Sequence, residues 1–137
     1  MVAFRVDGTP APQGSHRAFV VGGRAVVTND SKATKPWRKA VSAAATAAMA
    51  GGEPLDVAVE VVITFHLVRP ASVSVKKRPL PSVRPDVDKY ARSTLDGLTG
   101  IVYRDDSLVT DLRVVKRYAD FPGAIIMVRP VDLTAIA

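Results

Sequence analysis

The chain has 137 residues, 47% hydrophobic and 23% charged, which allows a single domain (residues 1–137) with its own core and excludes a disordered tail. Cysteine is absent, which excludes a disulfide framework and a thiolate zinc site and makes the reducing cytosol the expected setting. Lysine and arginine number 19 against 13 acidic residues, and the net charge of +6 either attracts nucleic acid or serves solubility alone. We expect neither a membrane span nor a signal peptide, because no apolar run of roughly 18 residues occurs and the N-terminus is not continuously apolar.

The N-terminal part of the sequence predicts β-structure. Residues 2–6 alternate weakly between apolar and polar side chains and predict a strand, which a loop rich in proline and glycine follows. Gly22 and Gly23 lie between two short segments at residues 17–21 and 24–28. A two-residue glycine turn between such segments is typical of a β-hairpin.

A helix and a long strand are expected next. Residues 29–31 offer a helix N-cap, and Pro36 suits a first helical turn. The Ala-rich residues 37–49 then predict a helix, which ends at the glycine pair 51–52. Residues 55–68 have apolar side chains at alternate positions and predict a long strand. This strand is apolar enough to need cover on both faces, which is one reason to expect a homodimer.

The second half of the sequence predicts a loop, a helix and two strands. Residues 69–84 contain several prolines and five basic residues and predict an exposed cationic loop. Residues 86–98 predict a helix, and strands are expected at 108–118 and 124–128. The resulting order predicts an α+β fold, with a mixed β-sheet and two main helices packed on one face.

Basic side chains in two places are candidates for DNA contacts. One group lies in the predicted cationic loop and the other near the end of the strand at 108–118. Phosphate contacts of this kind position a protein on DNA without reading its sequence. The candidates are Lys76, Lys77, Arg78, Arg84, Lys116 and Arg117.

Acidic residues are concentrated beside the predicted second helix. Six of the thirteen fall between Asp86 and Asp111, with Asp86 and Asp88 at the start of the helix and Asp105-Asp106 after it. One aspartate could simply cap the helix, but that explanation accounts poorly for two and leaves Asp105-Asp106 unexplained. A helix followed by a chain reversal would bring these carboxylates to one point, where they would suit Mg²⁺. A histidine-rich zinc site is not expected, because the two histidines are far apart in the sequence.

Cationic side chains accompany the acidic ones on the same helix. Arg92 lies four residues after Asp88, so the two share a helix face. Arg92 either forms an ordinary ion pair with Asp88 or Asp96 or stabilises charge at a scissile phosphate. Lys89 is the second candidate for the catalytic cation.

The segment Pro85-Asp86-x-Asp88-x-x-x-Arg92-x-x-Leu95-Asp96-x-Leu98-x-Gly100, followed by Asp105-Asp106-x-x-Val109, resembles the signature of the RusA family of Holliday-junction resolvases. The resemblance covers residues 85–109. It implies a small homodimeric crossover junction endodeoxyribonuclease of bacterial or phage origin. Such an enzyme cuts four-way DNA junctions in recombination and repair with Mg²⁺ or Mn²⁺.

The resemblance also implies roles for individual residues. Asp86 and Asp88 match the paired metal-binding aspartates, Asp106 matches the third, and Asp105 is a further contributor. Arg92 stands where the family has a catalytic lysine, and Lys89 stands where asparagine is common. Arginine keeps the charge but does not readily give up its proton, which favours phosphate clamping over general acid catalysis.

Two other functions remain open from the sequence. A nuclease for flaps or other branched DNA could use the same site. A non-catalytic DNA-binding module, whose acidic residues serve structure alone, is the alternative from another class. Cleavage of DNA would exclude the non-catalytic module. Comparison of junction, flap and duplex substrates would distinguish the junction resolvase from the flap nuclease.

Overall fold

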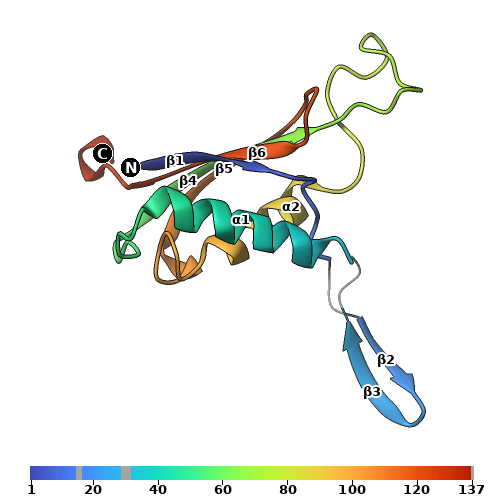
Figure 1. The fold of residues 1–137 in the computed structure, drawn as a ribbon, viewed down its shortest axis with the longest axis horizontal. Coiled ribbons are helices and arrows are strands. Elements are labelled where there is room, and N and C mark those ends of the chain that lie inside the picture. Colours follow the sequence, from blue (N-terminus) through green and yellow to red (C-terminus); the bar gives the residue numbers. More distant parts are fainter. Residues whose placement is uncertain (15–16, 29–31, 137) are drawn as a thin grey trace.

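The computed structural model describes residues 1–14, 17–28 and 32–136 and contains two main helices and six strands among them (Figure 1). In chain order the elements are β1 (Val2–Asp7), β2 (Arg17–Val21), β3 (Arg24–Thr28), α1 (Thr34–Met49), β4 (Val59–Leu67), α2 (Val87–Leu98), the 3-10 helix η1 (Asp106–Leu108), β5 (Val109–Tyr118), β6 (Gly123–Pro130) and the 3-10 helix η2 (Leu133–Ala135).

Four strands form one mixed sheet in the order β1-β6-β4-β5. β6 pairs antiparallel with both β1 and β4, whereas β5 runs parallel to β4. The parallel pair needs a crossover connection, and α2 lies within that connection. Both α1 and α2 cover the same face of the sheet (Figure 1), which confirms the α+β class expected from the sequence. The β2–β3 hairpin forms a separate two-stranded sheet.

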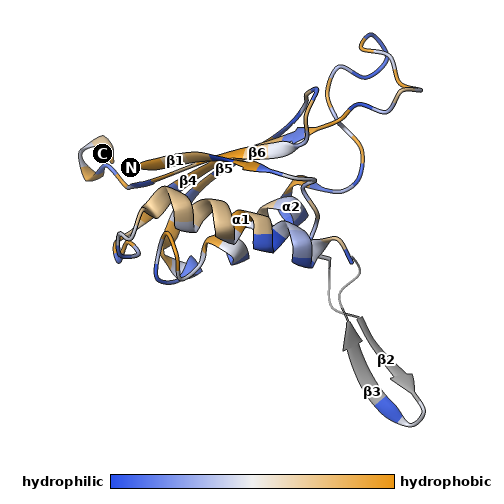
Figure 2. Cartoon of the chain, in the orientation of Figure 1, coloured by the Kyte–Doolittle hydropathy of each residue, from blue (hydrophilic) through white to orange (hydrophobic). Residues whose placement is uncertain are grey.

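The core lies between the two helices and the covered face of the sheet. Every second residue of β4, from Val59 to Phe65, is fully buried and faces the helices, where Trp37 and Val41 of α1 are also buried. Figure 2 shows hydrophobic residues concentrated on the strands of the sheet and on the second half of α1. Burial of apolar surface stabilises a fold by about 25 cal/mol per Å², so this layer is the main stabilising contribution to the folded state.

Close packing against α1 fixes the position of α2. A Cβ atom on Gly97 would lie 2.9 Å from Val41 Cγ1, so only glycine lets the two helices approach this closely. Ser42 Oγ donates a hydrogen bond to the Gly97 carbonyl oxygen at 2.8 Å, and the Trp37 indole donates to Thr94 at 3.0 Å. These contacts hold the second half of α2 against α1.

The N-terminal loop fastens the first turns of α2. Ser93 Oγ donates to the carbonyl oxygen of the buried Ala11 at 2.6 Å. The Gln13 backbone N–H donates to the Lys89 carbonyl oxygen at 3.0 Å, and Thr34 Oγ1 donates to that of Pro12 at 2.6 Å. The loop expected from the Pro/Gly content is therefore a structural support for α2.

Most predicted elements are confirmed, with shifted boundaries. The hairpin at 17–28 and the strands at the C-terminus are as expected, while the first helix begins earlier, at Thr34, with Ala33 at its N-cap position. The proposed cap at residues 29–31 lies outside the described residues. The strand predicted from residue 55 is wrong at its start, because β4 begins at Val59 and Leu55 instead forms an isolated bridge with Tyr103.

Among the helices of the described residues, none combines the length and the apolar character that crossing a membrane requires.

Candidate active site

Asp86 and Asp88 lie where α2 begins. Asp86 is the N-cap residue, with extended backbone angles of −70° and 149°, and its carboxylate makes no capping hydrogen bond within the described chain. Both aspartates are exposed, and Asp88 lies in the first turn. The helix dipole favours negative charge at this end. The simple explanation that a side-chain cap accounts for Asp86 is therefore wrong.

Arg92 lies beside Asp88 along a shallow groove of about 390 Å³ between α2 and β5. Its side chain is exposed. The ion pairs formed among the described residues do not include one between Arg92 and either Asp88 or Asp96. The ion-pair explanation for Arg92 is thus wrong in this structure. Lys89, partly buried, lies one position past Asp88.

Asp105 and Asp106 form a second acidic group near the other end of α2. The Asp105 carboxylate accepts a hydrogen bond from the Ser107 backbone N–H at 3.1 Å, and this bond lowers the pKa of Asp105. The pKa of Asp106 is raised, first by its hydrogen bond with Asp105 and then by partial desolvation and by the negative charges of Asp105 and Asp96. Two carboxyls that share a site in this way differ in proton affinity.

Asp96 and Tyr103 belong to the same end of the helix. Tyr103 is buried, which raises the pKa of its phenol, and the charges of Asp106 and Asp96 raise it further. Its hydroxyl donates to the Leu95 carbonyl oxygen at 3.0 Å. Asp106 is therefore located beside the last turns of α2.

The two acidic groups lie apart within one chain, so the expected convergence of the carboxylates is wrong at the level of the single chain. α2 has 12 residues, which corresponds to about 18 Å. β5 begins where α2 ends and runs back beside it, so that Lys116, near the end of β5, reaches the Pro85 carbonyl oxygen at 2.9 Å. The start of β5 therefore carries Asp106 away from Asp86.

A divalent metal ion therefore fits the chemistry of these side chains but not their arrangement in one chain. Carboxylate oxygens are the ligands that Mg²⁺ prefers. Among the described residues, however, no three histidine, aspartate or glutamate side chains come together in a way that could hold a metal ion. One chain alone does not assemble the predicted set of ligands.

The cationic loop is organised around Arg69, a residue that the sequence analysis did not single out. Its guanidinium donates to the Arg78 carbonyl oxygen and lies 4.1 Å from the centre of the Tyr118 ring. Lys76, Lys77 and Arg84 are exposed, and Arg78 is partly buried. The sequence offered no signal for this role, because Tyr118 belongs to a strand far along the chain.

Lys116 and Arg117 lie on opposite faces of β5 and do not form one surface. Lys116 pairs with the inward-facing Phe65, and its ammonium donates to the carbonyl oxygens of Val83 and Pro85 at 2.8 and 2.9 Å. Arg117 pairs with His66, on the face that the helices leave uncovered. Lys116 thereby ties the end of the cationic loop to β5 and positions the start of α2.

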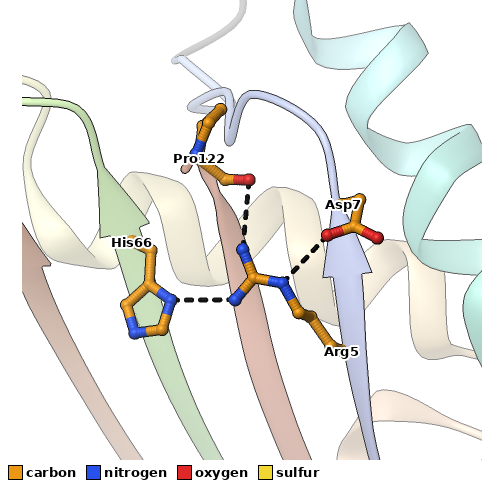
Figure 3. Close-up of polar contacts among 4 residues, drawn as sticks. All are labelled: Arg5, Asp7, His66 and Pro122. Atoms are coloured by element: carbon orange, nitrogen blue, oxygen red, sulfur yellow. Dashed lines mark hydrogen bonds and ion pairs between the residues drawn. The ribbon is translucent and has the colours of Figure 1, made fainter. Parts of the chain in front are cut away.

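A further polar cluster lies on the uncovered face at the same end of the sheet (Figure 3). Arg5 of β1 contacts Asp7 at 2.9 Å, His66 Nδ1 at 3.0 Å and the Pro122 carbonyl oxygen at 3.4 Å. Arginine can only donate, so His66 Nδ1 is the acceptor. His66 is therefore a residue of the uncovered strand face. Sequence analysis missed Arg5, whose partners come from three separate segments.

Residues 7–129 match the family described as Endodeoxyribonuclease RusA, a range that includes both acidic groups, Arg92 and the cationic loop. The chain belongs to the RusA endodeoxyribonuclease family. RusA membership identifies it as a nuclease, a hydrolase that acts on DNA, and confirms the resemblance seen at residues 85–109. The chain is also similar to the uncharacterized protein YqaN of Bacillus subtilis (strain 168), with 30% identity over 145 residues, covering 96% of this chain and 97% of that protein.

Proposed function

We propose that this RusA-family chain is a Mg²⁺-dependent, structure-selective endonuclease that resolves four-way DNA junctions by paired cleavage. The match over residues 7–129, which contains the motif at 85–109, carries this proposal. Mn²⁺ substitutes for Mg²⁺, and the protein acts as a homodimer in recombination and repair. The proposed setting is the bacterial cytosol, with a phage or prophage origin.

The proposed roles follow the chemistry of the side chains. Asp86, Asp88 and Asp106 are the proposed metal ligands, with Asp105 as a contributor. The exposed Arg92 is proposed to hold the scissile phosphate and to stabilise the charge that develops on it, with Lys89 as the second candidate. The proposed DNA contacts are Lys76, Lys77, Arg78, Arg84, Lys116 and Arg117.

The exposure of the groups at the start of α2 supports these roles. Asp86, Asp88 and Arg92 all face solvent, and their side chains form no ion pairs with the described residues. Exposed charges that serve no contact in the fold are available to a substrate. The exposed lysines of the cationic loop, Lys76 and Lys77, supply further positive charge for contacts with a DNA backbone.

The test is cleavage of a labelled four-way junction by the purified protein. We expect symmetrical cuts with Mg²⁺, no cuts after chelation, and recovery when Mn²⁺ is supplied. A matched flap and a linear duplex of the same sequence are the comparison substrates. Faster cleavage of the flap would replace junction resolution with the flap nuclease, and binding without cleavage of any substrate would favour the non-catalytic module.

A further inference from the structure

A pocket of about 330 Å³ lies between the two ends of the cationic loop, the end of β5 and the start of α2. Its walls come from segments that are far apart in the sequence, and most of them are apolar. We call it the loop pocket, and the lining residues that matter here are Val68, Pro81, Val83, Arg84, Tyr90 and Tyr118.

Two sets of contacts fix the walls of the loop pocket. At one end of the cationic loop, Arg69 donates to the Arg78 carbonyl oxygen and lies 4.1 Å from the centre of the Tyr118 ring. At the other end, Lys116 donates to the Val83 carbonyl oxygen at 2.8 Å. Both ends of the loop are therefore tied to β5. Because the pocket is already formed, a ligand does not have to order its walls on binding.

Tyr90 gives the loop pocket a polar group without a partner. Its ring packs against Phe65 at a centroid distance of 5.3 Å, and the residue is only 5% exposed. Its backbone carbonyl oxygen accepts hydrogen bonds, but its hydroxyl forms none with the described residues. A tyrosine hydroxyl that is largely buried usually has a hydrogen-bond partner. An atom of a ligand in the pocket can be that partner.

The loop pocket lies beside the proposed metal ligands at the start of α2. Arg84, which lines the pocket, is separated from Asp86 by Pro85 alone. The Tyr90 backbone N–H donates to the Asp86 carbonyl oxygen at 3.3 Å. Arg84 is exposed and adds a positive charge to the lining. Apolar walls, an unpartnered hydroxyl and a cation are thus combined next to the place where a phosphodiester is proposed to be cut.

We propose that the loop pocket receives one unstacked nucleobase of the DNA, from a nucleotide next to the scissile phosphate. The apolar faces of a base suit the walls, and its polar edge suits the Tyr90 hydroxyl. The phosphate of the same nucleotide suits Arg84. An apolar peptide side chain, by contrast, would leave both the hydroxyl and the guanidinium unmatched.

A base pocket at this position adds selectivity to the proposed cleavage. Unstacking a base costs least where base pairing is already interrupted, as it is at a branch point. The pocket therefore favours branched DNA over duplex and favours cutting at one position relative to the inserted base. This inference rests on the proposed function, because it assigns a substrate contact beside the same site.

Filling the pocket tests the proposal. Val68 lines the pocket and is 54% exposed, so Val68→Trp places an indole there without disturbing the core. Val75→Trp is the matched control, because Val75 is 65% exposed on the same connection and is not part of the lining. Affinity for a four-way junction is measured by fluorescence anisotropy, with calcium in place of magnesium. We expect Val68→Trp to weaken binding by about 5–10-fold, through loss of one base contact, and Val75→Trp to leave it unchanged.

Abasic junctions locate the inserted base. An abasic nucleotide is placed in turn at each position around the branch point, in both of the opposed strands. At one position Val68→Trp should no longer weaken binding, because the substitution and the missing base remove the same contact. At the other positions its effect should be as large as on the complete junction. The proposal is overturned if the effect of Val68→Trp is the same on every abasic junction, or no larger than that of Val75→Trp.

Tyr90→Phe tests the polar contact. The variant keeps the ring against Phe65 and removes only the hydroxyl, so the packing of the core is retained. We expect a loss of affinity of about 3–10-fold on the complete junction, the effect of one hydrogen bond. No loss is expected on the abasic junction that is insensitive to Val68→Trp. An equal loss on both junctions would contradict a contact between the hydroxyl and the base.

These affinities do not depend on cleavage, so the pocket and the proposed function can fail separately. If the unsubstituted protein cuts junctions but Val68→Trp shows no coupling to any base, the loop pocket does not hold a base and junction cleavage stands. If the coupling is found in a protein that cuts no DNA, the base contact stands and the proposed function is wrong. Failure to bind any branched DNA would overturn both.

Discussion

Arg92 has two candidate roles, an ion pair within α2 and a contact with a phosphate. It stands one turn after Asp88, a spacing that normally suggests an ion pair within the helix. The structure leaves the pair unformed among the described residues and places Arg92 on the rim of the groove. A guanidinium held there is suited to bind a phosphate with two parallel hydrogen bonds.

Substitutions at Arg92 should separate phosphate clamping from a structural role. Arg92→Ala is expected to lower the single-turnover rate by about 10²–10³-fold, because one electrostatic partner of the transition state is lost. Arg92→Lys should keep substantial activity, since the charge remains. Lys89→Ala is the control. A large loss there, with none at Arg92, would show that Lys89 is the catalytic cation.

Asp105 and Asp106 offer a prediction about protonation. The hydrogen bond from Asp106 to Asp105 is the main reason that the pKa of Asp106 lies above its ordinary value of 3.8. Asp105→Ala should therefore lower that pKa toward 3.8, as measured by carbon NMR titration of the metal-free protein. Asp111 does not contribute to the raised pKa of Asp106, so Asp111→Asn is the control and should leave the pKa of Asp106 unchanged.

The two carboxyls also have opposite effects on stability in acid. Because folding raises the pKa of Asp106, this carboxyl stabilises the folded protein at pH values below the pKa it has in the unfolded chain. That stabilisation is lost as pH rises through the pKa of Asp106 in the folded protein. Because folding lowers the pKa of Asp105, this carboxylate stabilises the folded protein at pH values above the pKa it has in the unfolded chain. That stabilisation is lost as pH falls through the pKa of Asp105 in the folded protein. An Asp106 pKa at or below 3.8 in the unsubstituted protein would contradict this account.

The candidate site residues could be chosen from the sequence, whereas their distribution in space could not. These candidates stand at recognisable spacings: Asp86 and Asp88 lie at the beginning of α2, Arg92 lies on its groove face, and Asp106 follows it in η1. Spacing alone could not say at which end of α2 the chain re-enters the sheet. That depends on β5 pairing parallel to β4, a contact between distant segments. Arg69 and Arg5 were missed for the same reason.

At the scale of elements, periodicity predicted the strands and helices but not all their limits. The alternation along β4 continues into residues 55–58, yet Leu55 leaves the sheet because its backbone bonds with Val102 and Arg104 instead. The glycine turn at 22–23 was sufficient to predict the hairpin, since its signal is entirely local. Strand order and the choice of covered face depend on long-range packing and could not be read locally.

The close contact between α1 and α2 predicts a sharp sensitivity at Gly97. Gly97→Ala places a methyl group 2.9 Å from Val41 Cγ1 and is expected to destabilise the fold by about 1–3 kcal/mol. Denaturant unfolding measures the loss. Val41→Ala in the same chain makes room for the methyl group, so the double variant should be more stable than the sum of the single effects predicts. If the effects of the two substitutions on the free energy of unfolding add strictly, the helices do not meet at Gly97 and Val41.

Two equally exposed leucine and isoleucine side chains allow a prediction about the edge of the sheet. Leu112 on β5 is 47% exposed, and Ile125 on the uncovered face is 46% exposed. If the proposed homodimer forms at this edge, Leu112→Glu should convert the dimer to a monomer in sedimentation experiments at micromolar concentration, because it would bury a charge between the two chains. Ile125→Glu should leave the dimer intact. The opposite pattern would assign the interface to the uncovered face.

For the whole molecule, the distribution of charge matters more than its sum. The net charge of +6 combines an acidic group at each end of α2 with a basic loop at one end of the sheet. Lys76 and Lys77 are exposed on that loop, while Lys35 and Lys39 are exposed on α1. If only the net charge of the protein matters for DNA binding, the two lysine pairs should contribute equally to affinity. If the loop contacts the DNA backbone, Lys76 and Lys77 should contribute more than Lys35 and Lys39.

Salt dependence distinguishes the two cases. Each phosphate contact releases counterions, so the affinity for a four-way junction should fall steeply with salt, and Lys76→Ala/Lys77→Ala should reduce the slope of log K against log salt by about 2. Lys35→Ala/Lys39→Ala changes the net charge equally but should leave the slope unaltered, because α1 lies away from the loop (Figure 1). Fluorescence anisotropy over a range of salt concentrations, with calcium in place of magnesium to prevent cutting, measures both. Equal slopes for the two double variants would mean that binding depends on overall charge and that the loop makes no phosphate contacts of its own.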